Sequence, residues 1–193
     1  MKINPVKDYL VQYRNKKLIP HLKRRIKLSI VEGKILMNSR VETANAKKII
    51  KEIVYITLAT ASRNGLPWIT PLFSAYDKDY NFYWISSSIS VHSVNITHNR
   101  NVAIIIYDSR APEGKGFGVY IRAKASVVET KSEIKKACRL IYRRKNKPIP
   151  SADNFTGDAP RKIYKAVPQA VFINDIKVKE GEFKHVRLEV QLK

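Results

Sequence analysis

The middle of the chain alternates between apolar and polar residues, a pattern typical of β-strands. Residues 54–61 (VYITLATA) alternate most regularly, and because both faces are apolar or small we expect a strand buried on both sides. Asn64-Gly65 follows and predicts a hairpin turn, since both residues tolerate positive φ. Residues 66–76 then return as the second strand, in which Pro71 indicates an edge, a bulge or a gap in the pairing.

Further segments carry the same β pattern. Residues 82–85 are predicted to close a three-strand meander, and residues 102–107 (VAIIIY) form a continuous apolar run that predicts a buried strand. The other predicted strands are residues 119–129, 168–174 and 185–192. About seven antiparallel strands predict a mainly β domain, a small barrel with peripheral helices.

Three segments have helical spacing instead. Residues 42–52 combine good helix formers with an apolar stripe, and residues 132–145 predict a basic amphipathic helix. Residues 160–167 predict a short third helix. Cys138 lies on the apolar face of the second helix, so we interpret it as a small core residue and not as a nucleophile.

The chain is strongly basic, a property that the hydrophobic pattern does not show. Hydrophobic residues make up 44% of the 193 residues, enough for a core, while 37 Lys and Arg against 16 Asp and Glu give a net charge of +21. This charge favours nucleic acid, an anionic membrane or a phosphorylated ligand as partner, and it is equally compatible with a simply basic surface.

The cysteine, the histidines and the apolar runs of the chain exclude several kinds of protein. The single cysteine excludes an intrachain disulfide, and the four scattered histidines lack the spacing of a zinc motif, so no metal site is predicted. No apolar run is long enough to span a membrane, and no leader peptide is evident. We therefore expect a cytoplasmic protein.

The first forty residues form the most basic block of the chain, with apolar residues at roughly helical spacing. We predict a basic, helical N-terminal arm at residues 1–43 and one folded domain at residues 44–193. The arm is interpreted as packing on the domain or on a partner subunit. The alternative is a patch that contacts nucleic acid or anionic lipid, together with the cluster Arg143-Arg144-Lys145.

The candidate chemistry lies in a serine-rich segment between two predicted strands. Hydroxyls, backbone N–H groups and an imidazole meet there at a strand end and a predicted helix N-terminus, which favours a phosphate site. The alternative interpretation is a turn in which Ser88 or Ser90 caps a helix. The polar residues are Ser86, Ser87, Ser88, Ser90, His92, Ser93 and Asn95.

The order of four segments resembles the pyridoxamine 5'-phosphate oxidase-related family of FMN-binding split β-barrels. These segments are ITLATASRNGLPWITPLFSAYD, FYWISSSISVHSVNITHNRNVAIIIYDS, VYIRAKASVVE, and RKIYKAVPQAVFIND together with VRLEVQL. The resemblance covers the chain from about Ala44 to Leu192. It implies a split barrel that forms a homodimer, with FMN at the subunit interface.

The resemblance also implies which residues bind the cofactor. Ser86 stands where a Thr is common, and His92 stands where many members have a Lys. No catalytic residue is implied, because the flavin itself carries out the hydride or electron transfer. The implied cofactor-binding residues are Thr70, Pro71, Leu72, Phe73, Ser74 and Ala75 on the second strand, Ile85 and Ser86 at a strand end, and Val91 and His92 on the short helix.

The chain departs from the pyridoxamine phosphate oxidases proper. Those enzymes would be expected to have Arg near Thr70 and at Val91, Lys near Ala75 and Gln near Gly118. Since such cations hold a phosphate by strong, directional hydrogen bonds, we predict another small-molecule substrate. Lys115, Arg122 and Lys124 are candidates to restore positive charge. The leading hypothesis is an FMN-dependent oxidoreductase of unknown substrate, and the alternatives are a non-catalytic binder of flavin, deazaflavin or haem, or a nucleic-acid-associated protein.

Overall fold

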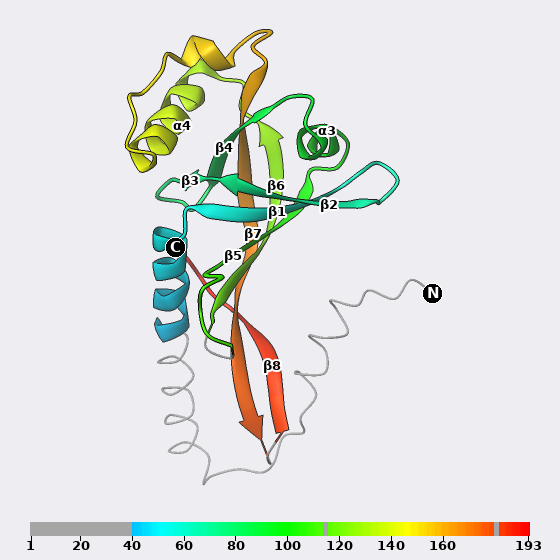
Figure 1. Cartoon of the computed structure of the whole chain (residues 1–193), viewed down its shortest axis with the longest axis vertical. Helices are drawn as coiled ribbons and strands as arrows, with labels where there is room; N and C mark the ends of the chain where they lie inside the picture. The colour runs from blue at the N-terminus through cyan, green and yellow to red at the C-terminus, as the bar shows by residue number, and fades with distance from the viewer. Residues whose placement is uncertain (1–39, 114–115, 180–181) are drawn as a thin grey trace, which may run out of the picture. The chain divides into compact units, whose positions relative to one another are not determined.

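The computed structural model describes residues 40–113, 116–179 and 182–193, whose strands form one antiparallel sheet (Figure 1). The predicted arm therefore lies, up to residue 39, outside the described residues. A helix at residues 40–52 comes first and confirms the helix predicted at residues 42–52. The other elements are β1 (Tyr55–Ala61), β2 (Pro67–Phe73), β3 (Ala75–Tyr76), β4 (Phe82–Ser87), α3 (Val91–His98), β5 (Asn101–Tyr107), β6 (Gly118–Val127), α4 (Lys131–Arg144), η1 (Ala152–Phe155), β7 (Arg161–Lys179) and β8 (Glu182–Glu189).

The long strand β7 connects the two parts of the sheet. The strand order is β2-β1-β5-β6-β7-β4-β3, and β8 pairs with β7 as well. On one edge β7 pairs with β6, and on the other it pairs first with β4 and then with β8 (Figure 1). A β-bulge between Arg122 and Ala123 interrupts the β6–β7 register, and such bulges increase local twist. The predicted mainly β, antiparallel split barrel is thus confirmed.

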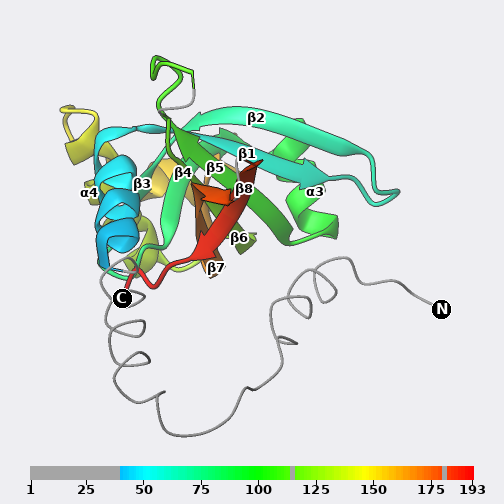
Figure 2. The same ribbon diagram turned by 90° about the horizontal axis from the view of Figure 1, so that it is seen from below.

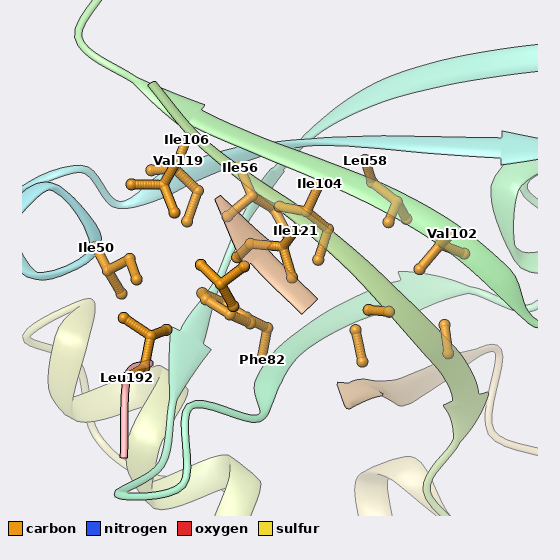
Figure 3. Close-up of a cluster of buried hydrophobic side chains, with 14 of the residues drawn as sticks. Ile50, Ile56, Leu58, Phe82, Val102, Ile104, Ile106, Val119, Ile121 and Leu192 are labelled. Atoms are coloured by element: carbon orange, nitrogen blue, oxygen red, sulfur yellow. The ribbon is translucent and has the colours of Figure 1, made fainter. Parts of the chain in front are cut away.

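One face of the sheet carries the main hydrophobic core. Ile56 and Leu58 of β1, Ile104 of β5 and Ile121 of β6 point toward one another, and each is at most 2% exposed (Figure 3). Ile50 of the helix at residues 40–52 joins the same cluster. Each such side chain contributes about 1.5–3 kcal/mol on full burial.

The helix α4 covers the opposite face of β4 and β7 and confirms the helix predicted at residues 132–145. Ile134, Cys138 and Ile141 form a second buried cluster with Tyr83 of β4 and Ile163 of β7. Cys138 is a buried free thiol whose pKa is raised by burial, so its interpretation as a core residue is confirmed. Figures 1 and 2 both show α4 next to the helix at residues 40–52.

Local hydrogen bonds close both ends of α4. At its start Thr130 is the N-cap, and its hydroxyl accepts a hydrogen bond from the amide of Glu133. At its end Asn146 has φ of +53°, and the amides of Asn146 and Lys147 donate to carbonyls of the last turn at 3.0 Å each. These two bonds form a Schellman motif, which fixes the direction in which the chain leaves the helix.

The predicted hairpin between β1 and β2 is confirmed, but its turn differs. Only Gly65 has positive φ, +83°, whereas Asn64 does not. The amide of Gly65 donates to the carbonyl of Ser62 at 3.0 Å, and the amide of Ser62 donates to the carbonyl of Leu66 at 2.9 Å. β2 is the last strand on its side of the sheet, so Pro71 lies in an edge strand, as predicted.

The predicted meander is wrong, because the single strand expected at residues 66–76 is two strands. β2 pairs with β1 only as far as Phe73, after which the amide of Ser74 donates to the carbonyl of Val54 at 3.0 Å. The chain then continues as β3, which pairs with β4. β4 in turn pairs with β7 and not with β2, a pairing between distant segments that local alternation does not reveal.

The helix predicted at residues 160–167 is also wrong, since these residues begin β7. Ile163 and Tyr164 lie on opposite faces of the strand and are 0% and 3% exposed, because a core covers each face there. A strand buried on both sides lacks alternation and is easily mistaken for a helix. The strand predicted at residues 168–174 belongs to the same β7, and the last strand is β8, which begins three residues earlier than predicted, at Glu182.

Residues 54–61 were predicted to be buried on both sides and residues 102–107 to form a buried strand, but in the single chain each strand is fully buried on one face only. Thr57 and Ala59 of β1 are only partly buried, and Ala103 and Tyr107 of β5 are exposed. The second cluster lies over β3, β4 and the start of β7, so it leaves the outer faces of β1 and β5 uncovered among the described residues.

A buried ion network joins α4 to the turn between β3 and β4. Asp77 is 4% exposed, and its carboxylate accepts a hydrogen bond from Lys136 at 2.6 Å. Burial raises the pKa of Asp77, but the hydrogen bonds from Lys136 and from Asn81 outweigh burial and hold this pKa well below its usual range. Tyr83 lies between Asp77 and Glu133, at 3.1 and 3.2 Å from their carboxylate oxygens.

We expect Asp77→Asn to lower the free energy of unfolding by about 3 kcal/mol, because it disrupts the hydrogen bonds that a buried carboxylate accepts from Lys136, Asn81 and Tyr83. The pKa of Asp77 is depressed in the folded state. The ionised carboxylate therefore stabilises the fold above about pH 4, and this stabilisation is lost as the pH falls further. Urea unfolding at several pH values measures both effects. The control is Asp79→Asn, a more exposed carboxylate in the same turn, for which a change of about 0.5 kcal/mol or less is expected. Equal losses in both variants would contradict the prediction.

Candidate functional site

Polar side chains gather where β4 ends and α3 begins. The Ser86 hydroxyl lies 2.7 Å from Nε2 of His92 and 3.1 Å from the hydroxyl of Ser90. Ser90 Oγ also lies 3.2 Å from Nε2 of His92, and it donates to Ser93 Oγ at 2.8 Å. Three hydroxyls and one imidazole therefore share a single hydrogen-bond network, which includes the predicted site residues Ser86 and His92.

The imidazole of His92 is held in this network in a buried position. The residue is 5% exposed, and burial lowers the pKa of His92 because it disfavours the charged ring. A neutral imidazole has one donor and one acceptor nitrogen, which suits hydroxyl partners that can turn either way. His92 thus serves the folded chain as a neutral hydrogen-bonding group.

The N-terminus of α3 has free backbone donors. Ser90 is the N-cap residue, as one interpretation of the sequence predicted, but its side chain makes no capping hydrogen bond. The amides of Val91, His92 and Ser93 precede the first residue that can donate within the helix, Val94, whose amide bonds the carbonyl of Ser90 at 2.9 Å. This end of the helix therefore has the donors that an anion requires.

The helix α3 is inverted relative to an ordinary surface helix. Besides Ile96 it buries the polar residues His92, Ser93 and Asn95, while Val91 and Val94 are 48% and 43% exposed. Polar residues face inward because α3 packs on β1 and β2, where the amide of Asn95 donates to the hydroxyl of Thr60 at 3.0 Å.

Two further hydroxyl oxygens of the predicted set have no partner. Thr70 Oγ1 and Ser74 Oγ are buried and make no hydrogen bond within the described residues, and the same is true of the indole N–H of Trp84. Buried polar groups in proteins are nearly always paired, so these unpaired donors are consistent with a ligand that completes them. A phosphate or a flavin offers the acceptors that these hydroxyls lack.

The predicted cofactor residues do not all face one way. Thr70 and Leu72 pair across β1 with Leu58 and Ile56, and so share the face of the main core. Pro71 and Phe73 alternate to the opposite face, where Phe73 packs against the second cluster. The remaining members diverge as well: Ala75 and Ile85 lie with the second cluster, and Val91 is exposed on α3.

Sequence reasoning did not include Thr60, Ser93, Asn95 or Trp84 in the candidate site. Ser93 and Asn95 were noted as polar members of the segment, yet polar residues on a short helix are expected to face solvent. No sequence pattern signals this arrangement, because Val91 and Val94 would be expected to face the core and are exposed instead. Nothing in the sequence marked Thr60 as a site residue, because it fits the regular alternation of its strand.

The uncovered outer face of the sheet is apolar and slightly hollowed. A depression of about 360 Å³ is lined by side chains of β1, β2, β5, β6 and β7, including the paired small residues Ala59 and Ala103. Arg122 is the one charged residue in its lining, and its guanidinium lies 5.5 Å from the ring centroid of Phe172. Lys124 is exposed on the same strand, whereas Lys115 lies outside the described residues.

Two kinds of site are not found within the described part of the chain. No three His, Cys, Asp or Glu residues of the described ranges approach closely enough to hold a metal ion. None of the described helices has the length and apolar character needed to cross a membrane.

Comparisons with known proteins agree on the fold. The family model described as pyridoxamine 5'-phosphate oxidase matches residues 42–175. No curated protein matches the chain. The solved structures described next are 17% to 19% identical to this chain, so their likeness concerns the fold.

Three of these structures illustrate the range of relatives. HutZ, the haem storage protein of Vibrio cholerae, is 19% identical over 67% of this chain and 92% of its own, with a TM-score of 0.58. A proposed 5-nitroimidazole antibiotic resistance protein of Bacteroides thetaiotaomicron is 18% identical over 67% of this chain and 81% of its own, with a TM-score of 0.57. A haem-binding protein of Mycobacterium smegmatis is 17% identical over 76% of this chain and 57% of its own, with a TM-score of 0.56.

The buried, neutral His92 predicts a pH dependence of stability. Because its pKa is lowered in the folded state, the unfolded chain takes up a proton first, and stability falls as the pH drops below about 6.5. His92→Gln is expected to flatten this decline between pH 7 and pH 5 in urea unfolding, while Thr97→Val, an exposed change on the same helix that removes no titratable group, keeps the decline. An NMR titration in which folded His92 protonates at or above pH 6.5 would contradict the assignment.

Proposed function

Because the chain belongs to the pyridoxamine 5'-phosphate oxidase family, we propose that it is an FMN-dependent oxidoreductase that works as a homodimer on a small-molecule substrate. The observation that carries this proposal is the pair of buried hydroxyls, Thr70 Oγ1 and Ser74 Oγ, that have no partner among the described residues. Both belong to the strand segment on which the family resemblance places cofactor contacts.

In this proposal the chain's own residues bind and orient the cofactor. The hydroxyls of Thr70 and Ser74 donate to flavin or phosphate oxygens, and the free amides at the start of α3 donate to the phosphate. Ser86 is held by His92, which keeps its hydroxyl in one position. Pro71, Leu72, Phe73, Ala75, Ile85 and Val91 are the proposed packing and backbone contacts.

The uncovered apolar face supports a dimer. The depression around Ala59 and Ala103 and the exposed residues Val91 and Val94 of α3 are apolar surface that a second copy would bury. Large exposed apolar patches on a protein surface mark interaction sites. A cofactor between two copies would then be shielded from water by both.

When bound, FMN supplies the hydride or electron transfer, so the protein needs no general base or nucleophile of its own. The serines beside His92 therefore have a binding role and form no Ser-His-Asp arrangement. The chain also lacks the cations expected for a pyridoxamine phosphate substrate, since Thr70, Ala75 and Val91 stand at the positions where they would lie. We therefore propose a substrate other than pyridoxamine 5'-phosphate.

The alternative is a non-catalytic binder of flavin, deazaflavin or haem. Two of the structures with this fold are haem proteins by description, which makes haem a ligand worth testing. Haem is commonly held by a histidine. His92 would have to leave its serine partners to act as such a ligand, so flavin is favoured over haem.

Spectroscopy of the purified full-length chain tests the function. We expect apo protein titrated with FMN to show perturbed flavin absorption, and a nicotinamide donor to bleach the bound flavin. Bleaching separates an oxidoreductase from a passive binder. A chain that ignores FMN but gives a Soret band with haem would overturn the proposal.

Matched variants test the site. Thr70→Val and Ser74→Ala each remove a hydroxyl that is unpaired in the free chain, so we expect unchanged or slightly higher stability together with FMN affinity reduced about three- to tenfold. Thr97→Val is the control, since Thr97 is exposed on α3 and bonds only the carbonyl of Val94. Loss of stability without loss of FMN affinity would show that these hydroxyls serve the fold instead.

A further inference from the structure

The cations of the described chain are concentrated around α4. Residues 131–147 contain eight Lys and Arg and one acid, Glu133, whose carboxylate is bonded to Lys165 at 2.6 Å. A flavin site at the β4–α3 junction makes no use of this charge. The contacts of each cation show which of these charges the fold uses.

Four of the eight cations serve the fold. Lys131 pairs with Asp153 at 2.7 Å, and Lys136 pairs with the buried Asp77. Arg144 donates to three backbone carbonyls at the end of the helix at residues 40–52, at 2.8 to 3.0 Å. Lys145 lies over aromatic rings, 5.2 Å from that of Phe73. Of the predicted cluster Arg143-Arg144-Lys145, only Arg143 is thus left for a partner.

The other four cations form a row. Lys135, Arg139 and Arg143 are spaced by four residues on α4, and Lys147 continues the spacing just beyond the helix. All four are exposed, and none pairs with a carboxylate among the described residues. We call these four residues the basic row.

The basic row is unfavourable for the folded chain by itself. Like charges four residues apart on a helix repel each other, and opposite charges there would stabilise it. The helix dipole favours cations only in the last turn, so it accounts for Arg143 but not for Lys135 or Arg139. Local positive potential is also evident at Lys145, whose pKa is lowered by burial and further by the charges of Lys147 and Arg161. An anionic partner would relieve this repulsion.

The chemistry around the row selects the kind of anion. A helix that inserts into a membrane surface needs an exposed apolar face, but the apolar residues of α4 are buried in the second cluster. Single-stranded nucleic acid is bound by exposed aromatic residues, and the one aromatic of α4, Tyr142, is partly buried with the ammonium of Lys145 5.1 Å from its ring centroid. A duplex is the remaining anion, since its dense phosphates can be neutralised by lysine and arginine alone, without apolar or aromatic contacts.

We propose that Lys135, Arg139, Arg143 and Lys147 form a docking surface for the phosphate backbone of double-stranded nucleic acid. Binding through this surface is independent of base sequence, because the row offers only cations. It is separate from the flavin site and does not rest on the proposed oxidoreductase function. Such binding would bring the protein to DNA or duplex RNA through residues of α4 and just beyond it, and not through the β4–α3 junction.

Fluorescence anisotropy with a labelled DNA duplex of about 20 base pairs, measured on the full-length chain over a series of salt concentrations, tests this proposal. Each phosphate contact contributes about 0.9 to the slope of log K against log salt. We therefore expect the triple variant Lys135→Gln, Arg139→Gln, Arg143→Gln to bind more weakly, with a slope smaller by about 2.7. Its melting temperature should be equal to or above that of the wild type, because repulsion is removed.

The control removes the same charge elsewhere. Lys47→Gln, Lys48→Gln, Lys51→Gln changes three cations on the helix at residues 40–52, and we expect it to keep nearly the wild-type slope. Equal loss of slope in both triple variants would assign the binding to net charge and overturn the proposal. Absence of duplex binding by the wild type would overturn it too, as would binding to phosphatidylserine vesicles in preference to the duplex.

Discussion

The pairing of β7 with β6 on one edge and with β4 and β8 on the other is the constraint on which the rest of this structure depends. One edge of β7 continues the sheet that begins with the β1–β2 hairpin, and the other edge receives β4. Because β4 lies there, the main core forms on one face of the sheet and α4 packs on the other. The same placement brings Ser86 to the point where the chain turns into α3. The site at the β4–α3 junction therefore depends on a strand that is nearly eighty residues away in the sequence.

The inverted helix α3 shows how a fold can keep polar groups inside. His92, Ser93 and Asn95 are buried because each finds a hydroxyl partner, which removes most of the cost of taking it out of water. The hydroxyls of Thr70 and Ser74 have no such partner, and they lie in the segment expected to contact a cofactor. The contrast between satisfied and unsatisfied polar groups is the physical basis for placing a ligand on this side of the barrel.

Much of the fold could be predicted from local pattern. The alternation of residues 54–61, the Gly65 turn and the amphipathic helix around Cys138 are each fixed by interactions within a short segment. The break at Ser74 could not be predicted, because β2 and β3 differ only in their pairing partners. Residues 160–167 were wrongly predicted as a helix for a related reason. Ile163 and Tyr164 are both buried, so this part of β7 does not alternate between apolar and polar residues.

The candidate site could be predicted only where it depends on local features of the sequence. Ser86 and His92 were found from their place at a strand end and a helix start, which are local features, and the structure brings them within 2.7 Å. Asn95 and Thr60 meet across 35 positions of sequence, so no local pattern reports their contact. The long-range partners of a site are therefore what sequence reasoning missed.

The β4–β7 pairing also sets the order of events during synthesis. Phe82 pairs with Ala166 and Ser87 with Arg161, contacts between segments more than seventy positions apart that form slowly because a long loop must close first. The β1–β2 hairpin and α4 can form while the ribosome is still translating the chain. The edge of β4, and with it the junction that carries Ser86, stays unpaired until β7 has emerged. A chain in which β7 is not yet available therefore lacks the completed β4–α3 junction, whatever local structure its earlier segments have already formed.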